Sequence, residues 1–340
     1  MKIYLLVIVL LFSGSTVFSQ GEVPDLFEES DSYPLIGNWE GQWINPQIGY
    51  EKTHPALAAQ IDIADENLYI VRILPVLYKR APLFLEVEVP LLNSELTCNK
   101  DGWNFRFAGD RCTGYGFLYG DTVQFTLTKR REVPPTLGLQ APEQAVKLLD
   151  GTGLSYWKHT DGREVTWKID PSGVLETVSE FWNNGENRSQ GIGGSIETIQ
   201  KFGDLQFHME FRYPLEAGKK GQGRGNSGLF FSGIGEIQIL NSFALPGYWD
   251  EGGAIYKRFP PMVNAAGPPL QWQTYNVELS LPEYHSATGE KISNAFLTVY
   301  LNGVLIHNKI EIETDVTAVS IGLQDHINRL QYRNIWVLEK

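Results

Sequence analysis

Two glutamates in the second half of the chain lie in segments where apolar and polar side chains alternate. In residues 204–212 the apolar residues fall on one face and Glu210 on the other, and in residues 235–240 Glu236 and Gln238 share the polar face. Alternate residues of a β-strand face opposite sides of its sheet. We therefore predict that these three polar side chains project into one concave face of one sheet. A carboxylate in such a place can take or give a proton, which makes both glutamates catalytic candidates.

Each carboxylate also has a structural alternative. Glu210 and Glu236 can face solvent, or they can form ion pairs with Arg212 or Arg224 that only hold the fold together. The alternation of residue types does not separate these cases.

His326 is the histidine that we expect to take part in proton transfer. It follows Gln324 and Asp325 at the end of a predicted strand, where loop residues gather around a cleft. We expect the neighbouring Asp325 carboxylate to raise the pKa of the imidazole. The alternative is an ordinary surface histidine, and His208, on the polar face near Glu210, is the second candidate.

Other side chains have the chemistry to hold a ligand. Arg224 and Asn226 lie in the glycine-rich segment 223–228, where the backbone can approach a ligand closely and a planar guanidinium can hold an oxyanion. The alternative is a tight turn in which Arg224 ties down a loop. The predicted binding set is completed by an amide and by two rings that can stack on an apolar face or else belong to the core: Gln238, Tyr256 and Trp272.

Signatures of several other chemistries are missing from the sequence. Segment 223–228 lacks the Gly-Lys-Ser/Thr ending of a phosphate loop, and there is no Gly-x-Ser-x-Gly elbow or His-Glu-x-x-His pair. We therefore predict no metal site and no cofactor, with a divalent cation held by oxygen ligands as the open alternative. The net charge of −12 argues against a nucleic-acid partner.

Short strands separated by Gly, Asp and Asn turns must position these side chains. No long helical periodicity appears, and such a pattern predicts an all-β chain built as a sandwich or jelly roll. We divide it into a small all-β domain over residues 35–132, a proline-rich linker over 133–143 and a second β-domain over 144–340.

The first residues have the pattern of a secretory signal. Lys2 precedes an apolar run over residues 3–12, and Val17-Phe18-Ser19 is a small-x-small cleavage pattern. We predict a signal peptide over 1–19, an acidic leader over 20–34, and a secreted or periplasmic protein that leaves the membrane after cleavage. The alternative is an uncleaved anchor, although the apolar run is too short to span a bilayer as a stable helix.

Cys98 and Cys112 are the only cysteines. The residues between them have the pattern of a turn and a returning strand, so we predict a disulfide within one hairpin of the N-terminal domain. The alternatives are two free buried thiols or, with less support, a metal pair.

Three blocks in the second half resemble a known family: residues 223–230, 235–243, and 323–326 with 332–337. The first reads Gly-Arg-Gly-Asn-Ser-Gly-Leu-Phe, the second contains Glu-Ile-Gln-Ile-Leu-Asn-Ser, and the third opens with Leu-Gln-Asp-His. Together they resemble the 3-keto-disaccharide hydrolase family, over residues 144–340. The resemblance implies a concanavalin-like jelly roll. It also implies hydrolysis of disaccharides or glycosides whose glucose ring carries a ketone at carbon 3.

The chain departs from the family pattern at one position. The family usually has Asp-Ser after the Glu-x-Gln strand, and this chain has Asn241-Ser242. Asparagine keeps the shape of the side chain and loses its charge.

The chemistry of a 3-keto sugar defines what a site must contain. The ketone acidifies the hydrogen on carbon 2, so a base can remove it, the glycosidic oxygen can leave by elimination, and water can add afterwards. The other route uses two carboxylates that flank the glycosidic bond. The main alternative to an exported hydrolase is a carbohydrate-binding module without turnover, followed by a structural surface protein.

Overall fold

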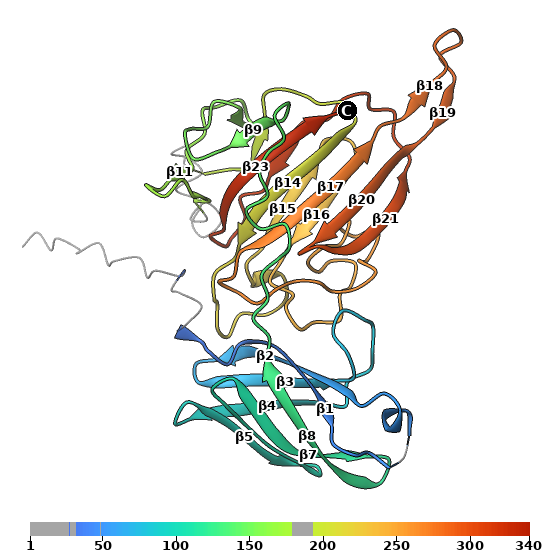
Figure 1. The fold of residues 1–340 in the computed structure, drawn as a ribbon. Helices are drawn as coiled ribbons and strands as arrows, with labels where there is room; N and C mark the ends of the chain where they lie inside the picture. Colours follow the sequence, from blue (N-terminus) through green and yellow to red (C-terminus); the bar gives the residue numbers. More distant parts are fainter. Residues whose placement is uncertain (1–26, 28–31, 48, 179–192) are drawn as a thin grey trace, which may run out of the picture.

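The computed structural model describes Phe27 and residues 32–47, 49–178 and 193–340. The all-β fold predicted from the sequence is confirmed: an N-terminal barrel is followed by a jelly-roll sandwich (Figure 1). The predicted signal peptide over 1–19 and most of the leader over 20–34 lie outside the described residues. Within the described ranges, no helix is long and apolar enough to cross a membrane.

The N-terminal unit is a closed antiparallel barrel in which β8 pairs back onto β1. Residues alternate between its interior and its surface, and aromatic rings fill the interior; Trp43 and Phe125, for example, have ring centroids 5.6 Å apart. A 3-10 helix, η2 (Tyr50–Lys52), follows the first strand. The strands are β1 (Gly37–Trp43), β2 (Ala56–Asp65), β3 (Leu68–Leu74), β4 (Leu85–Leu92), β5 (Glu95–Lys100), β6 (Trp103–Ala108), β7 (Arg111–Leu118) and β8 (Asp121–Lys129).

The predicted disulfide between Cys98 and Cys112 is wrong. Both cysteines are free and buried in the barrel. Cys98 lies on β5 opposite Phe105, and Cys112 lies on β7 opposite Phe107. Strand β6 therefore runs between them, and two strand spacings place their Cα atoms roughly 9 Å apart, beyond the reach of about 7 Å that a disulfide allows.

The C-terminal unit is a sandwich of two sheets. The larger sheet has the order β11-β12-β23-β14-β17-β20-β21, with β9 beside β23, and the smaller has the order β10-β13-β22-β15-β16. A hairpin of β18 and β19 stands apart, and the 3-10 helix η3 (Gly221–Gly223) precedes β15. The strands are β9 (Val146–Leu149), β10 (Trp157–His159), β11 (Lys168–Ile169), β12 (Leu175–Glu176), β13 (Ile196–Thr198), β14 (Leu205–Arg212), β15 (Ser227–Phe231), β16 (Gly235–Ile239), β17 (Gln273–Ser280), β18 (Glu283–Tyr284), β19 (Lys291–Ser293), β20 (Ala295–Leu301), β21 (Val304–Ile312), β22 (Ile321–Leu323) and β23 (Gln331–Glu339).

Both sheets direct their apolar side chains into one shared core. Phe207 of β14 packs edge to face against Phe231 of β15, with ring centroids 5.7 Å apart. Ile237 and Ile239 of β16 join the same buried cluster. The polar residues that alternate with them on each strand must therefore point out of the sandwich, away from the other sheet.

The segment between the two units lies across the outer face of the larger sheet (Figure 1). The Thr136 hydroxyl lies 2.7 Å from the Thr274 hydroxyl on β17. Further along, the Gly138 backbone N–H donates to Oε1 of Glu210 at 2.6 Å, and Nδ2 of Asn334 donates to the Leu139 carbonyl at 3.0 Å. Residues 133–143, predicted as a linker, are thus held against the sandwich by specific hydrogen bonds.

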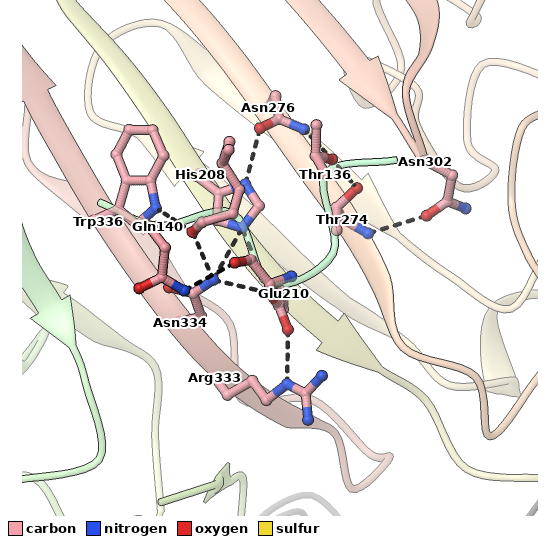
Figure 2. A network of polar contacts seen from close by, with 12 residues as sticks. Thr136, Gln140, His208, Glu210, Thr274, Asn276, Asn302, Arg333, Asn334 and Trp336 are labelled. Carbon is pink, nitrogen blue, oxygen red and sulfur yellow. Dashed lines mark hydrogen bonds and ion pairs between the residues drawn. The ribbon is translucent and has the colours of Figure 1, made fainter. Parts of the chain in front are cut away.

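Glu210 is the central acceptor of this network (Figure 2). Besides Gly138, it accepts hydrogen bonds from Nε of Arg333 at 2.7 Å and from Nδ2 of Asn334 at 2.8 Å. Burial alone would raise the pKa of its carboxyl, but these hydrogen bonds and the nearby His208 outweigh it and lower the pKa of Glu210 to about 2. The carboxylate is therefore a fixed anion that holds residues 133–143, and its ion-pair partner is Arg333 instead of the expected Arg212 or Arg224.

Two arginines fasten the barrel to the sandwich. Arg80, between β3 and β4, donates from Nη2 to the carbonyls of Gly247 and Pro261 at 2.7 Å and 2.6 Å. Arg224 forms an ion pair with Asp62 of β2, whose side chain is almost fully buried. Arg224 therefore ties down a loop between the two units, which is the structural alternative for this residue.

We predict that Cys98 and Cys112 stay reduced. Burial raises the pKa of both thiols, so a thiol reagent should react slowly with the folded protein and should titrate both cysteines after unfolding without reductant. Added reductant should leave the melting temperature unchanged. The absence of titratable thiol in the unfolded, unreduced protein would contradict the structure.

We also predict that Glu210→Gln destabilises the protein by about 2–4 kcal/mol at pH 7, because it leaves Arg333 without its buried anion. The folded-state pKa of Glu210 is lowered, so this contribution is complete above the ordinary glutamate range and is lost as the pH falls toward about 2. Denaturant unfolding at pH 7 and pH 3 measures the difference. The control is Glu283→Gln on the exposed hairpin, which should change little; equal stability of Glu210→Gln and wild type at pH 7 would refute the anchoring role.

Candidate functional site

The outer face of the smaller sheet carries the other predicted carboxylate. On β16, Ile237 and Ile239 face the core, so Glu236 and Gln238 face outward. Residues 253–256 run antiparallel along the free edge of β16. The Gln238 N–H donates to the carbonyl of Ala254, and the Tyr256 N–H donates to the carbonyl of Glu236, both at 2.9 Å.

The structure separates residues that we predicted to lie together. Glu210 belongs to the larger sheet, whereas Glu236 and Gln238 belong to the smaller one. The shared core lies between the two sheets, so their polar faces point in opposite directions. The prediction that all three side chains share one concave face of one sheet is therefore wrong, and the two glutamates cannot flank one bond.

The carboxyl of Glu236 lies over the backbone of Gly228 on β15. A Cβ atom added to Gly228 would meet Oε1 of Glu236 at 2.2 Å and its Cδ at 2.9 Å. A side chain there would push the carboxyl away. The glycine in the Asn-Ser-Gly motif thus makes room for a glutamate on the neighbouring strand, and it does so without needing an unusual backbone conformation.

One amide contacts this carboxyl, and a second lies on the same face of the sheet. With its nitrogen turned toward the available acceptors, the buried Gln238 donates to Oε1 of Glu236 at 3.1 Å and to the Ser227 carbonyl at 2.8 Å. On the other side of β15, the Gln324 N–H donates to the Gly228 carbonyl at 2.9 Å. Gln324 follows the core-facing Leu323 of β22, so alternation places its side chain on the same outer face.

Burial without a cationic partner controls the electrostatics of Glu236. Among the residues that the structure describes, no lysine, arginine or histidine lies within ion-pair distance of this carboxyl. Burial raises the pKa of Glu236 to about 7. A carboxyl that titrates near neutral pH can both accept and donate a proton, which is the requirement for general acid–base catalysis.

Asn226 is a structural residue in this arrangement. Its Nδ2 donates to the Gln222 carbonyl at 2.7 Å, and its backbone N–H donates to Oδ1 of Asn328 at 3.0 Å. Gln222 in turn donates to the Asp250 carbonyl at 2.7 Å. The amide nitrogen of Asn226, which we predicted to bind a ligand, therefore donates to a protein acceptor. This hydrogen bond holds η3 in place beside the site.

His326 lies at the end of β22, on the same sheet as Glu236, with β15 between the two strands. Burial lowers the pKa of its imidazole, so the expected rise caused by Asp325 is wrong. Asp325 is adjacent in sequence and its buried carboxylate accepts a hydrogen bond from the Gly194 N–H at 2.8 Å. That bond directs the carboxylate to the 193–195 segment.

The aromatic candidates divide between the two faces. Ile237 pairs with Ile255, so Tyr256 lies opposite Glu236 on the outer face, and Nζ of Lys257 stands 5.0 Å from its ring centroid. Trp249 is 55% exposed, and its carbonyl accepts from the Lys257 N–H. Trp272 lies on the opposite side of the sandwich from Glu236, where Cζ of Arg333 is 4.0 Å from its ring centroid.

Asn241, where the family usually has Asp, is 3% exposed just beyond β16. Its N–H donates to the Arg224 carbonyl at 3.0 Å, and its Oδ1 accepts from the Phe243 N–H at 3.4 Å. The side chain thus closes a short turn of its own segment.

Sequence reasoning missed two amides at this site. The sequence could have indicated Gln324, because Ile321 and Leu323 alternate as core-facing residues and the next position therefore faces outward. No such pattern indicates Gln222, because it lies in the single turn η3 and is placed by contacts with distant segments. Within the described ranges, no group of three or more His, Cys, Asp or Glu residues is arranged to hold a metal ion.

Comparison with solved structures found several similar chains. A provisionally assigned glycosyl hydrolase from Parabacteroides distasonis ATCC 8503 is 31% identical with a TM-score of 0.51, and the match covers 59% of this chain and 85% of that one. Two further structures from that organism, likewise provisionally assigned, are 17% and 18% identical with TM-scores of 0.41 and 0.40; the matches cover 58% of this chain and 94% and 100% of theirs. The search of curated proteins gave no match.

The family comparison covers more than half of the chain. Residues 144–338 match the model of the 3-keto-alpha-glucoside-1,2-lyase-like domain. These residues include all of the sandwich strands from β9 to β22 and nearly all of β23. The chain, through its C-terminal sandwich, belongs to the 3-keto-alpha-glucoside-1,2-lyase-like family, the one that its sequence motifs resemble.

Proposed function

We propose that this protein cleaves the glycosidic bond of 3-keto-glycosides or 3-keto-disaccharides by elimination followed by addition of water. The observation that carries the proposal is the partly buried Glu236 carboxyl, whose pKa is raised to about 7 on a face that also holds Gln238, Gln324 and Tyr256. The family description, which names a 1,2-lyase, supports an elimination between carbons 1 and 2.

In this mechanism Glu236 is the proton carrier. Its carboxylate takes the proton from carbon 2, the electron pair forms the double bond between carbons 1 and 2, and the glycosidic oxygen leaves from carbon 1. The protonated Glu236 returns the proton to the leaving oxygen. Water then adds to the unsaturated ketone, so that the sum of the two steps is hydrolysis.

The neighbouring groups have supporting roles in the proposal. A negative charge develops on the ketone oxygen during proton removal, and an amide N–H donor such as that of Gln324 stabilises such charge. Gln238 directs both of its side-chain N–H groups to protein acceptors and holds the Glu236 carboxyl in place. Tyr256 offers a ring and a hydroxyl to the sugar. The lowered pKa of His326 keeps its imidazole neutral near pH 7, so we assign it to hydrogen bonding with the substrate rather than to protonating the leaving oxygen.

We further propose that the protein works outside the cytoplasm, as a secreted or periplasmic enzyme, because of the signal pattern in residues 1–19. Sugar binding without turnover is the second candidate function, and the loss of charge at Asn241 relative to the family pattern favours it. Release of monosaccharide from a 3-keto-disaccharide, with none from the unoxidised parent sugar, distinguishes catalysis from binding.

We predict that Glu236→Gln lowers the turnover of a 3-keto-disaccharide roughly 10²–10⁴-fold, because the variant keeps the shape of the side chain and loses the proton carrier. Substrate binding should change little. The matched control is Glu283→Gln on the exposed hairpin, which should retain full activity. A substrate deuterated at carbon 2 should react more slowly with the wild type, and full activity of Glu236→Gln would overturn the assignment.

The pH dependence follows from the same group. The carboxylate form of Glu236 starts the reaction, and its pKa is raised to about 7. The value of kcat/KM should therefore be low at pH 5, rise through about pH 7 and level off above it. A profile that is already flat from pH 5 upward would mean that a carboxyl with an ordinary pKa does the work.

A further inference from the structure

Strand β7 of the barrel turns its aromatic residues outward, although Cys112 and Leu118 of the same strand face the core. Its aromatic side chains face solvent: Tyr115 is 49% exposed and Phe117 is 51% exposed. The residues that alternate with them, Gly114 and Gly116, face the interior and are buried. Burial of apolar area is the main favourable term in folding, so two large rings left outside need an explanation.

The barrel interior explains the glycines. A Cβ atom on Gly116 would lie 2.5 Å from a ring atom of Trp103 and 2.6 Å from one of Trp43, and a Cβ on Gly114 would lie 2.5 Å from Cβ of Phe105. No side chain fits inside at these two positions. The interior does not explain the outward rings, because solvent-facing positions of a strand accept polar residues.

The surroundings of Tyr115 are neutral and rich in amides. Across the sheet, Tyr115 pairs with Asn104 of β6 on one side and with Gln124 of β8 on the other. Asn99 of β5 pairs with Asn104 and extends the row. All three amide side chains are exposed. Among the described residues, none of them has a hydrogen-bond partner within the protein.

The exposed apolar area of this face and the net charge of the chain restrict the kinds of ligand or protein that can bind there. Two half-exposed rings offer roughly 200 Å² of apolar surface, whereas a stable protein interface buries about 800 Å² on each partner. Stacking platforms for nucleic acid need a basic groove, and this chain has a net charge of −12. A neutral ligand with flat apolar faces and many hydroxyl groups is complementary to both the rings and the amides.

We propose that the outer face of β7 is a carbohydrate-binding site for a neutral polysaccharide chain. Sugar rings stack on Tyr115 and Phe117, and their hydroxyls form hydrogen bonds with the amides of Asn99, Asn104 and Gln124. The site lies on the barrel, so the proposal is independent of the chemistry proposed for the sandwich. It gives the N-terminal unit the role of holding the protein on a polymeric sugar.

The test uses the full chain in native gels that contain soluble dextran, mixed-linkage β-glucan or arabinoxylan. At least one of these should slow the migration of the wild type. The Tyr115→Ala/Phe117→Ala double variant should bind at least tenfold more weakly to the same polysaccharide in titration calorimetry. The matched control is Tyr156→Ala, which removes a tyrosine that is 41% exposed on the sandwich and should bind like the wild type.

Three results would overturn the proposal. The first is unchanged migration of the wild type with all three polysaccharides, and the second is equal binding by the double variant. The third is self-association of the wild type without sugar that the double variant loses in sedimentation velocity, which would assign the face to a second copy of the chain. A melting temperature close to that of the wild type shows that the double variant is folded, and Gln124→Ala, which should also weaken binding, tests the amide row separately.

Discussion

Two sheets that share one apolar core can present their polar residues only on opposite faces. In this sandwich the core is built by strands such as β14 from the larger sheet and β15 and β16 from the smaller one. Every polar side chain that alternates with a core residue therefore belongs to one of two separate surfaces. The larger sheet uses its surface to hold the connecting segment, and the smaller sheet keeps the surface on which Glu236 lies.

The same residue type has different chemistry on the two surfaces. Glu210 is surrounded by donors from Gly138, Arg333 and Asn334, and the pKa of its carboxyl is lowered to about 2. Glu236 is partly buried beside an amide, with no cation of the described residues within ion-pair distance, and its pKa is raised to about 7. A proton carrier works best when its pKa lies near the working pH, so the surroundings give Glu236 the pKa that this role requires and give Glu210 a pKa that suits a permanent anion.

The alternation of residue types within each segment predicted which side chains point away from the core. The surface on which they lie depends on contacts between segments that are far apart in the sequence. Alternation correctly indicated that Glu210, Glu236 and Gln238 point away from the core, and the motif blocks pointed to the family that the comparison then showed. The sheet to which each strand belongs depends on pairing between segments far apart in the chain. No periodicity of a single segment contains that information.

Contacts between distant segments also decide the remaining cases. Cys98 and Cys112 are separated by a length that suits a hairpin, but β6 fills the space between their strands. Asp325 is next to His326 in sequence, yet its carboxylate is held by the backbone of Gly194. Arg224 lies in the glycine-rich motif and reaches Asp62, a residue of the other unit. In each case a partner distant in sequence decided the role.

The central claim is that burial, with no cation of the described residues within ion-pair distance, gives Glu236 a pKa near neutrality. Carbon-detected NMR of protein labelled at the glutamate side-chain carboxyl carbons tests it directly, with Glu236→Gln used to assign the resonance. We predict that this carboxyl titrates with a midpoint at about pH 7, well above the ordinary glutamate value of about 4.3. A midpoint within the ordinary glutamate range would contradict the account.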